Sequence, residues 1–338
     1  MRSAIVFFLF CLPGLPGLCF VVTKKQFEGY FMANGKEVPF VVKLWINGDS
    51  LSGNYYYSGI GKDISLNGRL KGNNITITET YDSVVTGVFT GFYYRGADSI
   101  AGTWTGKKGR KKLHFHLERR EWVDYRIIYR NKGRTEGDWG WNWIEMLGNP
   151  DTVAQRKFNA LDENTAVAPG AIWGPGFDRD STQYSFAKLT TVDLAAPGFI
   201  SFEVFHSDYL GGMGANNDIE HYLFDFESQG FLTLNELLRE DTSSEEILGK
   251  WIETEIKRRG DWDNWQADYV SNSDGFPGND FYFANDGVYF FFPRPGAVTN
   301  ILGIEDVRIP YDKMVLILAK NTEEYKWVVE KLGRGRQY

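Results

Sequence analysis

The sequence predicts an α+β protein in which an N-terminal antiparallel β-meander, able to close into a small barrel, precedes a larger α+β domain. Three observations support this fold class. Short strand patterns separated by glycines fill residues 27–119. An Asp-Gly pair lies between two aromatic runs at residues 281–292, which is typical of a β-hairpin. Apolar residues with helical spacing appear later in the chain, at residues 151–161 and again from residue 243. We expect three regions: residues 1–19, 20–120 and 121–338.

Residues 1–19 have the features of a secretory signal peptide. Arg2 precedes an apolar run at residues 4–12, and a proline- and glycine-rich segment follows. Nine apolar residues are too few to span a bilayer. Gly17 and Cys19 are small enough for the cleavage positions, so we place cleavage after Cys19. Lipoprotein anchoring at Cys19 is the alternative, but Leu18 fits it badly, since a small residue is needed there. We therefore expect a secreted or periplasmic mature protein.

The mature chain is expected to be acidic, without thiols and without a membrane span. Both cysteines, Cys11 and Cys19, belong to the leader, which excludes disulfides and thiolate metal sites from the rest. Loss of Arg2 leaves 36 basic against 44 acidic residues, a net charge of −8. This charge repels phosphate backbones, so no nucleic-acid partner is expected. The one basic cluster, residues 107–112, is typical of a solvated hairpin loop. No later stretch reaches 18 apolar residues.

The N-terminal region predicts about eight short strands. Connections this short force strands that follow one another to pair, which produces a meander or a barrel. Glycines adjacent to aromatic residues recur, as expected where a ring folds over a curved strand. The predicted strands are residues 27–31, 40–46, 51–57, 64–70, 75–79, 87–94, 100–104 and 113–117.

The aromatic hairpin at residues 281–292 predicts the core of the C-terminal domain. With the turn at Asp286-Gly287, Asn285 pairs with Val288, and alternation separates the side chains into two faces. One face carries four phenylalanines and is expected to be buried. The other face carries tyrosines and is the one available for function. The first set is Phe281, Phe283, Phe290 and Phe292, and the second is Tyr282, Ala284, Tyr289 and Phe291.

Further elements of the second region follow from local signals. Asp151 or Thr152 caps a helix that extends to residue 161. Thr233 and Glu236 form a capping box before a short helix. A longer amphipathic helix starts at residue 243 or 244 and ends at residue 260. The remaining patterns predict strands at residues 199–205, 221–226, 307–311 and 314–318, with the third at a sheet edge because it contains a proline.

Five short motifs follow one another in the second region. They are Tyr-x-Gly-Gly at 209–212, Phe-Asp-Phe at 224–226, Gly-x-Leu-Thr-Leu-x-x-Leu-Leu at 230–238, Phe-Tyr-x-x-x-Asp-Gly-Val-x-Phe at 281–290 and Val-x-Ile-Pro-Tyr at 307–311. Their order resembles the extracytoplasmic domain shared by RsiV-type anti-sigma factors and PdaC-type peptidoglycan deacetylases. The resemblance covers residues 199–315 and extends weakly upstream to residue 122. It implies an α+β recognition domain outside the cytoplasm, and RsiV-type members bind lysozyme.

The sequence departs from this family in ways that leave only binding to be implied. The family often continues its glycine pair with Ala-His, whereas Gly211-Gly212 here is followed by Met-Gly. We find neither the membrane helix and cytoplasmic segment of an anti-sigma factor nor the catalytic domain of a deacetylase. A possible partner is therefore a lysozyme-like protein or peptidoglycan.

Signals for catalysis are few. His114 and His116 share a strand face, but no third metal ligand can be placed beside them, so no metal site is expected. No nucleophile elbow is present. Asp261 and Asp263 lie beside Trp262 and Trp265, which is the pattern of a glycosidase carboxylate pair next to sugar-stacking rings.

The leading hypothesis is therefore a non-enzymatic binding protein of the cell envelope, without a cofactor, that recognises a lysozyme-like protein or a cell-wall glycan. One alternative is a carbohydrate-active hydrolase that acts on cell-wall glycan through Asp261 or Asp263. Another is a barrel that binds an apolar ligand. Candidate binding residues lie in the glycine loop, the tryptophan-rich loops and the tyrosine face; they are Tyr209, Gly211, Gly212, Trp141, Trp262, Trp265, Tyr282 and Tyr289.

Overall fold

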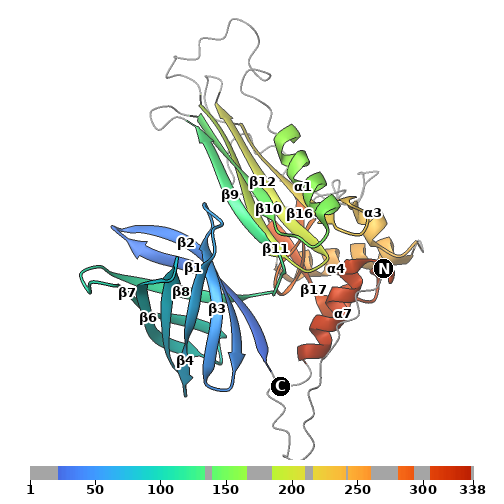
Figure 1. Cartoon of the computed structure of the whole chain (residues 1–338). Helices are drawn as coiled ribbons and strands as arrows, with labels where there is room; N and C mark the ends of the chain where they lie inside the picture. The colour runs from blue at the N-terminus through green and yellow to red at the C-terminus, as the bar shows by residue number, and fades with distance from the viewer. Residues whose placement is uncertain are drawn as a thin grey trace, which may run out of the picture. The chain divides into compact units, whose positions relative to one another are not determined.

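The chain folds into two compact units in a computed structural model. The structure describes residues 22–133, 139–165, 185–209, 216–240, 243–259, 281–292 and 305–335. The first unit comprises Met1–Tyr57 and Lys62–Arg120, and the second comprises Ser58–Gly61 and Glu121–Tyr338 (Figure 1). The predicted fold class, α+β with a barrel-like first part, is confirmed.

The first unit is a closed barrel of eight antiparallel strands. Each strand pairs with the next one along the chain, and β1 also pairs with β8, which closes the sheet. All eight strands expected from the sequence are present. They are β1 (Thr23–Ala33), β2 (Lys36–Asn47), β3 (Ser50–Tyr57), β4 (Ile64–Lys71), β5 (Asn74–Tyr81), β6 (Val84–Tyr94), β7 (Ser99–Gly106) and β8 (Lys112–Arg120).

Side chains fill the barrel interior. Phe31 and Phe40 stack with ring centroids 4.0 Å apart near the middle of an aromatic cluster. The buried carboxylate of Glu79 accepts hydrogen bonds from Tyr55 Oη at 2.9 Å, from Trp104 Nε1 at 2.6 Å and from the Thr86 hydroxyl. A Cβ at Gly87 would overlap the Trp104 indole, so glycine is required where this ring folds over β6. The buried side chains of the interior form one packed hydrophobic cluster.

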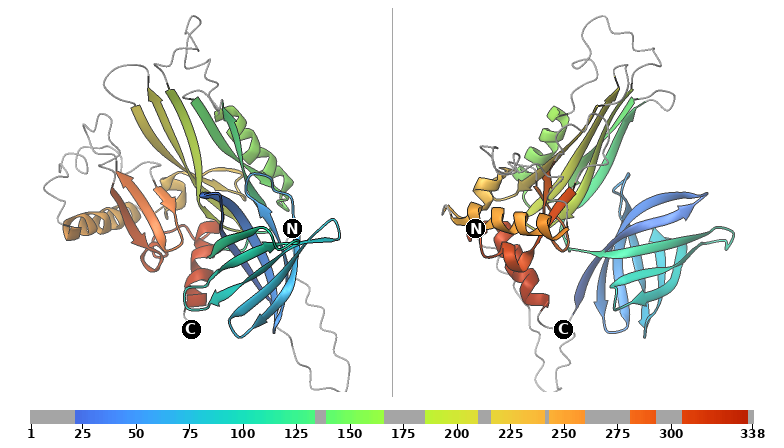
Figure 2. Two further views of the ribbon diagram at one scale, coloured as in Figure 1. Left: turned by 90° about the vertical axis from the view of Figure 1, so that its left-hand side faces the viewer. Right: turned by 180° about the vertical axis from the view of Figure 1, so that it is seen from behind.

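The second unit is built on a six-stranded sheet in the order β14-β13-β12-β11-β10-β9. Neighbours are antiparallel except β10 and β11, which are parallel. Helix α1 (Thr152–Thr165) runs along one face (Figure 2), where Phe158 packs edge-on against Phe202 and Phe224. The strands are β9 (Arg126–Gly133), β10 (Trp139–Leu147), β11 (Ser185–Ala195), β12 (Phe199–Tyr209), β13 (Asn216–Asp225) and β14 (Gly230–Phe231).

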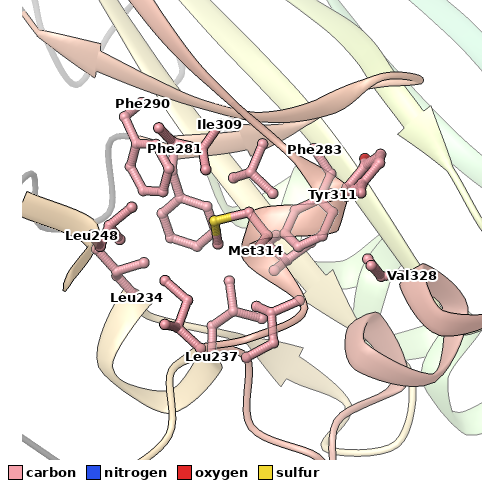
Figure 3. Close-up of a cluster of buried hydrophobic side chains, with 14 of the residues drawn as sticks. Leu234, Leu237, Leu248, Phe281, Phe283, Phe290, Ile309, Tyr311, Met314 and Val328 are labelled. Atoms are coloured by element: carbon pink, nitrogen blue, oxygen red, sulfur yellow. The ribbon is translucent and has the colours of Figure 1, made fainter. Parts of the chain in front are cut away.

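The other face of the large sheet carries a three-stranded sheet and several helices. The small sheet consists of β15 (Phe281–Phe283), β16 (Gly287–Phe292) and β17 (Glu305–Pro310). Its phenylalanine face packs against α3 (Leu234–Leu237), α4 (Ser243–Arg259), α6 (Tyr311–Met314) and α7 (Glu323–Gly335), as Figure 3 shows for the central side chains. The backbone N–H of Phe283 donates to Ser201 Oγ at 3.0 Å, which ties β15 to β12.

The aromatic hairpin has the predicted faces but a different register. Phe283 pairs with Val288 and Phe281 with Phe290, so the turn residues are Asn285 and Asp286. The predicted turn at Asp286-Gly287 is wrong, because the glycine serves another purpose. A Cβ at Gly287 would lie 2.7 Å from the backbone oxygen of Ile309, so the close approach of β17 requires it. The two registers differ by an even number of residues, so Phe281, Phe283 and Phe290 are still buried on one face and Tyr282 and Tyr289 lie on the other. Phe291, predicted on the available face, is only 6% exposed.

Other local predictions are mostly confirmed. Asp151 caps α1 by accepting from the N–H groups of Val153 and Ala154. The capping box of Thr233 and Glu236 is present. The predicted strand at residues 314–318 is wrong, because α6 and a following turn occupy this segment and only Leu318 forms a bridge. The sequence analysis did not predict α7, although Thr322 caps it by accepting from the N–H of Tyr325 at 3.2 Å and Glu323 and Glu324 lie in its first turn. Among the helices of the described ranges, none is long and apolar enough to cross a membrane.

Removal of one ring from the phenylalanine face should destabilise the second unit strongly. Phe290 is fully buried, so Phe290→Ala leaves a cavity and is expected to lower the free energy of unfolding by about 3–5 kcal/mol. Urea denaturation followed by tryptophan fluorescence measures this change. Leu316, which is 60% exposed, provides the control, and Leu316→Ala should stay within about 0.5 kcal/mol of the wild type. Equal effects of the two substitutions would contradict the assignment of the core.

Candidate functional site

Three aromatic rings form a row that begins on the tyrosine face of the small sheet. Tyr282 and Tyr289 are direct cross-strand partners, with ring centroids 5.1 Å apart and planes 9° from parallel. Tyr282 also stacks on His221 of β13, at 4.7 Å and 16°. The two tyrosines are half-buried, whereas His221 is only 5% exposed. The row therefore leads from two partly solvated tyrosines of the small sheet to a buried histidine of the large sheet.

Hydrogen bonds and an ion pair hold the tyrosines in place. The Tyr282 hydroxyl donates to Asp306 Oδ2 at 2.6 Å, and the Tyr289 hydroxyl donates to Asp286 Oδ1 at 3.1 Å. Arg308, the cross-strand partner of Tyr289 on β17, forms an ion pair with Asp286 at 2.9 Å. Burial raises the pKa of Tyr282, and its bond to Asp306 adds to the shift. Both rings are thus fixed as neutral hydrogen-bond donors.

Three carboxylates from different strands gather next to this row. Asp193 lies at a β-bulge in β11, where the pairing with β12 shifts between Val192 and Leu194. A bulge re-aims side chains, and here it brings Asp193 within electrostatic reach of Glu203 on β12 and Asp306 on β17. Burial raises the pKa of Asp193 to about 8, and the negative charges of Glu203 and Asp306 add to the shift.

The pKa values of Glu203 and His221 are also shifted from their ordinary values. Burial raises the pKa of Glu203, although a hydrogen bond from Thr191 opposes the shift. Burial lowers the pKa of His221 to about 4, so its imidazole is neutral at physiological pH. Asp193 Oδ2 and His221 Nδ1 are buried without a hydrogen-bond partner. We call Asp193, Glu203, Asp306 and His221 together the acidic cluster.

The structure brings together two of the eight candidate residues predicted from the sequence, Tyr282 and Tyr289. Tyr209 is the last residue of β12, opposite Ser185, and Trp141 lies in β10 between Lys132 and Lys188; only their backbones are described. Gly211, Gly212, Trp262 and Trp265 lie outside the described residues, as do Asp261 and Asp263 of the hydrolase alternative.

Sequence reasoning missed the acidic cluster. Asp193 precedes no recognisable motif, and a β-bulge leaves no local signature. Glu203 and His221 are 18 positions apart and meet only because β12 and β13 pair in this register. The one available signal was Asp306, which borders the Val-x-Ile-Pro-Tyr motif on the tyrosine side of β17.

No metal-binding geometry accompanies these residues. Within the part of the chain that the structure describes, no three or more histidine, cysteine, aspartate or glutamate side chains are arranged to hold a metal ion. His116 instead lies 3.5 Å from the carboxylate of Glu118 on the barrel surface.

Comparisons with known proteins provide little beyond the fold. No family model matches the chain, and no curated protein matches it. A DUF3298 family member from Bacteroides fragilis is similar in structure, with a TM-score of 0.44 and 14% identity, over 61% of this chain and 96% of its own. A DUF3298 family protein from Pseudomonas aeruginosa has a TM-score of 0.41 and 14% identity, over 58% and 94%. These values are too low to assign a family or function, and the RsiV-type resemblance stays a prediction.

Asp193 should make stability depend on pH. The unfolded chain releases this proton near pH 4, whereas the folded protein holds it to about pH 8, so rising pH favours unfolding across this window. We expect Asp193→Asn to raise the free energy of unfolding at pH 8, relative to the wild type, on the order of 1–3 kcal/mol, with a much smaller difference at pH 4. Denaturant titrations at both pH values measure it.

The difference between the variant and the wild type isolates the effect of Asp193. Burial raises the pKa of Glu324 to about 8 as well, but Glu324 is unchanged in both proteins and cancels from the difference. Glu240→Gln, at an exposed carboxylate, serves as the control for loss of a negative charge. A stability difference that is the same at pH 4 and pH 8 would show that Asp193 is not held protonated.

Proposed function

We propose that this chain is a non-enzymatic, extracytoplasmic binding protein whose second unit contacts a lysozyme-like protein through the tyrosine face of the small sheet. The observation that carries the proposal is the placement of Tyr282 and Tyr289, partly solvated and rigidly stacked, beside carboxylates that lack a basic partner. Rigid tyrosines combine a large contact area with a polar tip and little conformational entropy to lose, which suits them to protein recognition.

The geometry favours a protein partner over a glycan. A sugar stacks on an open ring face, but Tyr282 is already stacked against both His221 and Tyr289. Of the two tyrosines, only Tyr289 has a ring face that is not covered by the other rings of the row. The acidic side chains of Glu203 and Asp306, joined by Asp193 when it is ionised, also complement a basic protein surface rather than a neutral polysaccharide. The RsiV-type resemblance points to the same class of partner.

The proposal is tested by binding assays on the mature protein. Immobilised lysozyme should retain it, and Tyr289→Ala should weaken the affinity about tenfold, because truncation of a central aromatic contact typically removes more than 1 kcal/mol. Tyr94→Ala, at an exposed tyrosine of the barrel, is the matched control and should bind like the wild type. Surface plasmon resonance measures both variants.

Other results would point elsewhere. Retention by insoluble peptidoglycan but not by lysozyme would move the proposal to a glycan ligand. Turnover of cell-wall fragments that is lost in Asp261→Asn or Asp263→Asn would replace it with the hydrolase alternative. No retention by either material would remove the proposal.

A further inference from the structure

Among the residues that the structure describes, no basic side chain pairs with the carboxylates of the acidic cluster. Asp193, Glu203 and Asp306 come from β11, β12 and β17, and their charges act on one another. Within the described ranges, none of the three side chains forms an ion pair with a lysine, arginine or histidine. The nearest such group on the small sheet, Arg308, pairs with Asp286 instead. Arg259 donates to the backbone oxygen of Asp306 at 2.8 Å and pairs with Glu255.

His221 provides an independent observation at the same place. It is the direct cross-strand partner of Glu203, so the two side chains share one face of the large sheet. Its ring stacks on Tyr282, whose hydroxyl is bound to Asp306. His221 is 5% exposed, and its Nδ1 lacks a partner. A buried polar atom without a partner costs free energy, which a bound group would recover.

The chemistry of the unpartnered atoms indicates what such a group must provide. Carboxylate oxygens accept hydrogen bonds, and a neutral imidazole accepts at one ring nitrogen. The hydroxyl of Tyr282, the tyrosine that stacks on His221, already donates its hydrogen bond to Asp306. A complementary group therefore brings several donors, no acceptor and a positive charge. Ammonium and guanidinium groups have these properties.

The surroundings suit an organic cation better than a metal ion. The described residues contain no set of ligands with metal-binding geometry. The outer face of the Tyr289 ring is not covered by Tyr282, and an aromatic ring attracts an organic cation through its negative face. Asp193, Glu203, Asp306 and both tyrosines are partly solvated, which leaves a route for an incoming side chain.

We infer that the acidic cluster is a subsite for one cationic side chain, the ammonium of a lysine or the guanidinium of an arginine, supplied by the bound partner. This inference rests on the proposed function for the identity of the macromolecule, but the subsite itself binds the isolated chemical group. The carboxylates of Asp193 and Glu203 accept the donors, and His221 accepts a further hydrogen bond.

The test uses small probes, so that it does not depend on the partner. The probes are N-acetyl-lysine methylamide and N-acetyl-arginine methylamide, with N-acetyl-norleucine methylamide as the neutral control. The full chain has four histidines, so a spectrum of the protein labelled with ¹⁵N-histidine is simple, and His221→Gln assigns the signal of interest. Both cationic probes should shift the His221 signal in a saturable manner, whereas the neutral probe should not.

Variants and pH add further readouts. Asp193→Asn and Glu203→Gln should each raise the dissociation constant of the cationic probes at least about fivefold, while Glu240→Gln should leave it unchanged. Unshifted signals of the other histidines show that each variant is folded. The affinity of the wild type for the cationic probes should rise between pH 6.5 and pH 9, because Asp193 must ionise to pair with a cation. The other titratable groups next to Asp193 are Glu203, Asp306, His221 and Tyr282.

The outcomes separate this inference from the proposed function. Equal shifts with the neutral probe, or equal affinity in Asp193→Asn, would overturn the subsite. A saturable response to calcium ions but to neither cationic probe would overturn it in favour of a metal. Probe binding without lysozyme binding would keep the subsite and remove the proposed partner. Lysozyme binding without probe binding would do the reverse.

Discussion

The burial of one face of a short aromatic sheet is the constraint on which the second unit depends. Phe281, Phe283 and Phe290 are almost completely excluded from water and lie at the centre of a cluster that joins the large sheet to four helices. Because strand side chains alternate, burial of the phenylalanines forces the tyrosines between them to the opposite face. The core that stabilises the fold therefore also positions the surface proposed for binding.

The acidic cluster opposes this stabilisation. Partly desolvated carboxylates near one another destabilise a folded protein unless protons or partners neutralise them. Asp193 is held protonated by its surroundings, and the raised pKa of Glu203 shows the same conflict. The barrel also buries a carboxylate, that of Glu79, but there three donors of the barrel itself form hydrogen bonds to its oxygens.

Much of the local structure was predictable, because it follows from interactions between residues close in sequence. The eight barrel strands are joined by short turns, so alternation and glycine breaks were sufficient to locate them. The caps at Asp151 and Thr233 depend on side chains within three residues of the N–H groups they satisfy. The hairpin shows the limit of this reasoning. Gly287 was interpreted as a turn residue, whereas the backbone of Ile309, more than twenty positions away, is what requires it.

By itself, the sequence determined the fold class, most strands and helices, and the separation of the hairpin into a phenylalanine face and a tyrosine face. These properties depend on periodicity and short-range hydrogen bonds, which a linear chain contains. Only the tertiary structure decided the hairpin register, the helical turn at Tyr311–Met314 and the meeting of Asp193, Glu203, Asp306 and His221. Those features depend on which strands pair and on which side chains are buried from water. Both are set by contacts between residues far apart in the sequence.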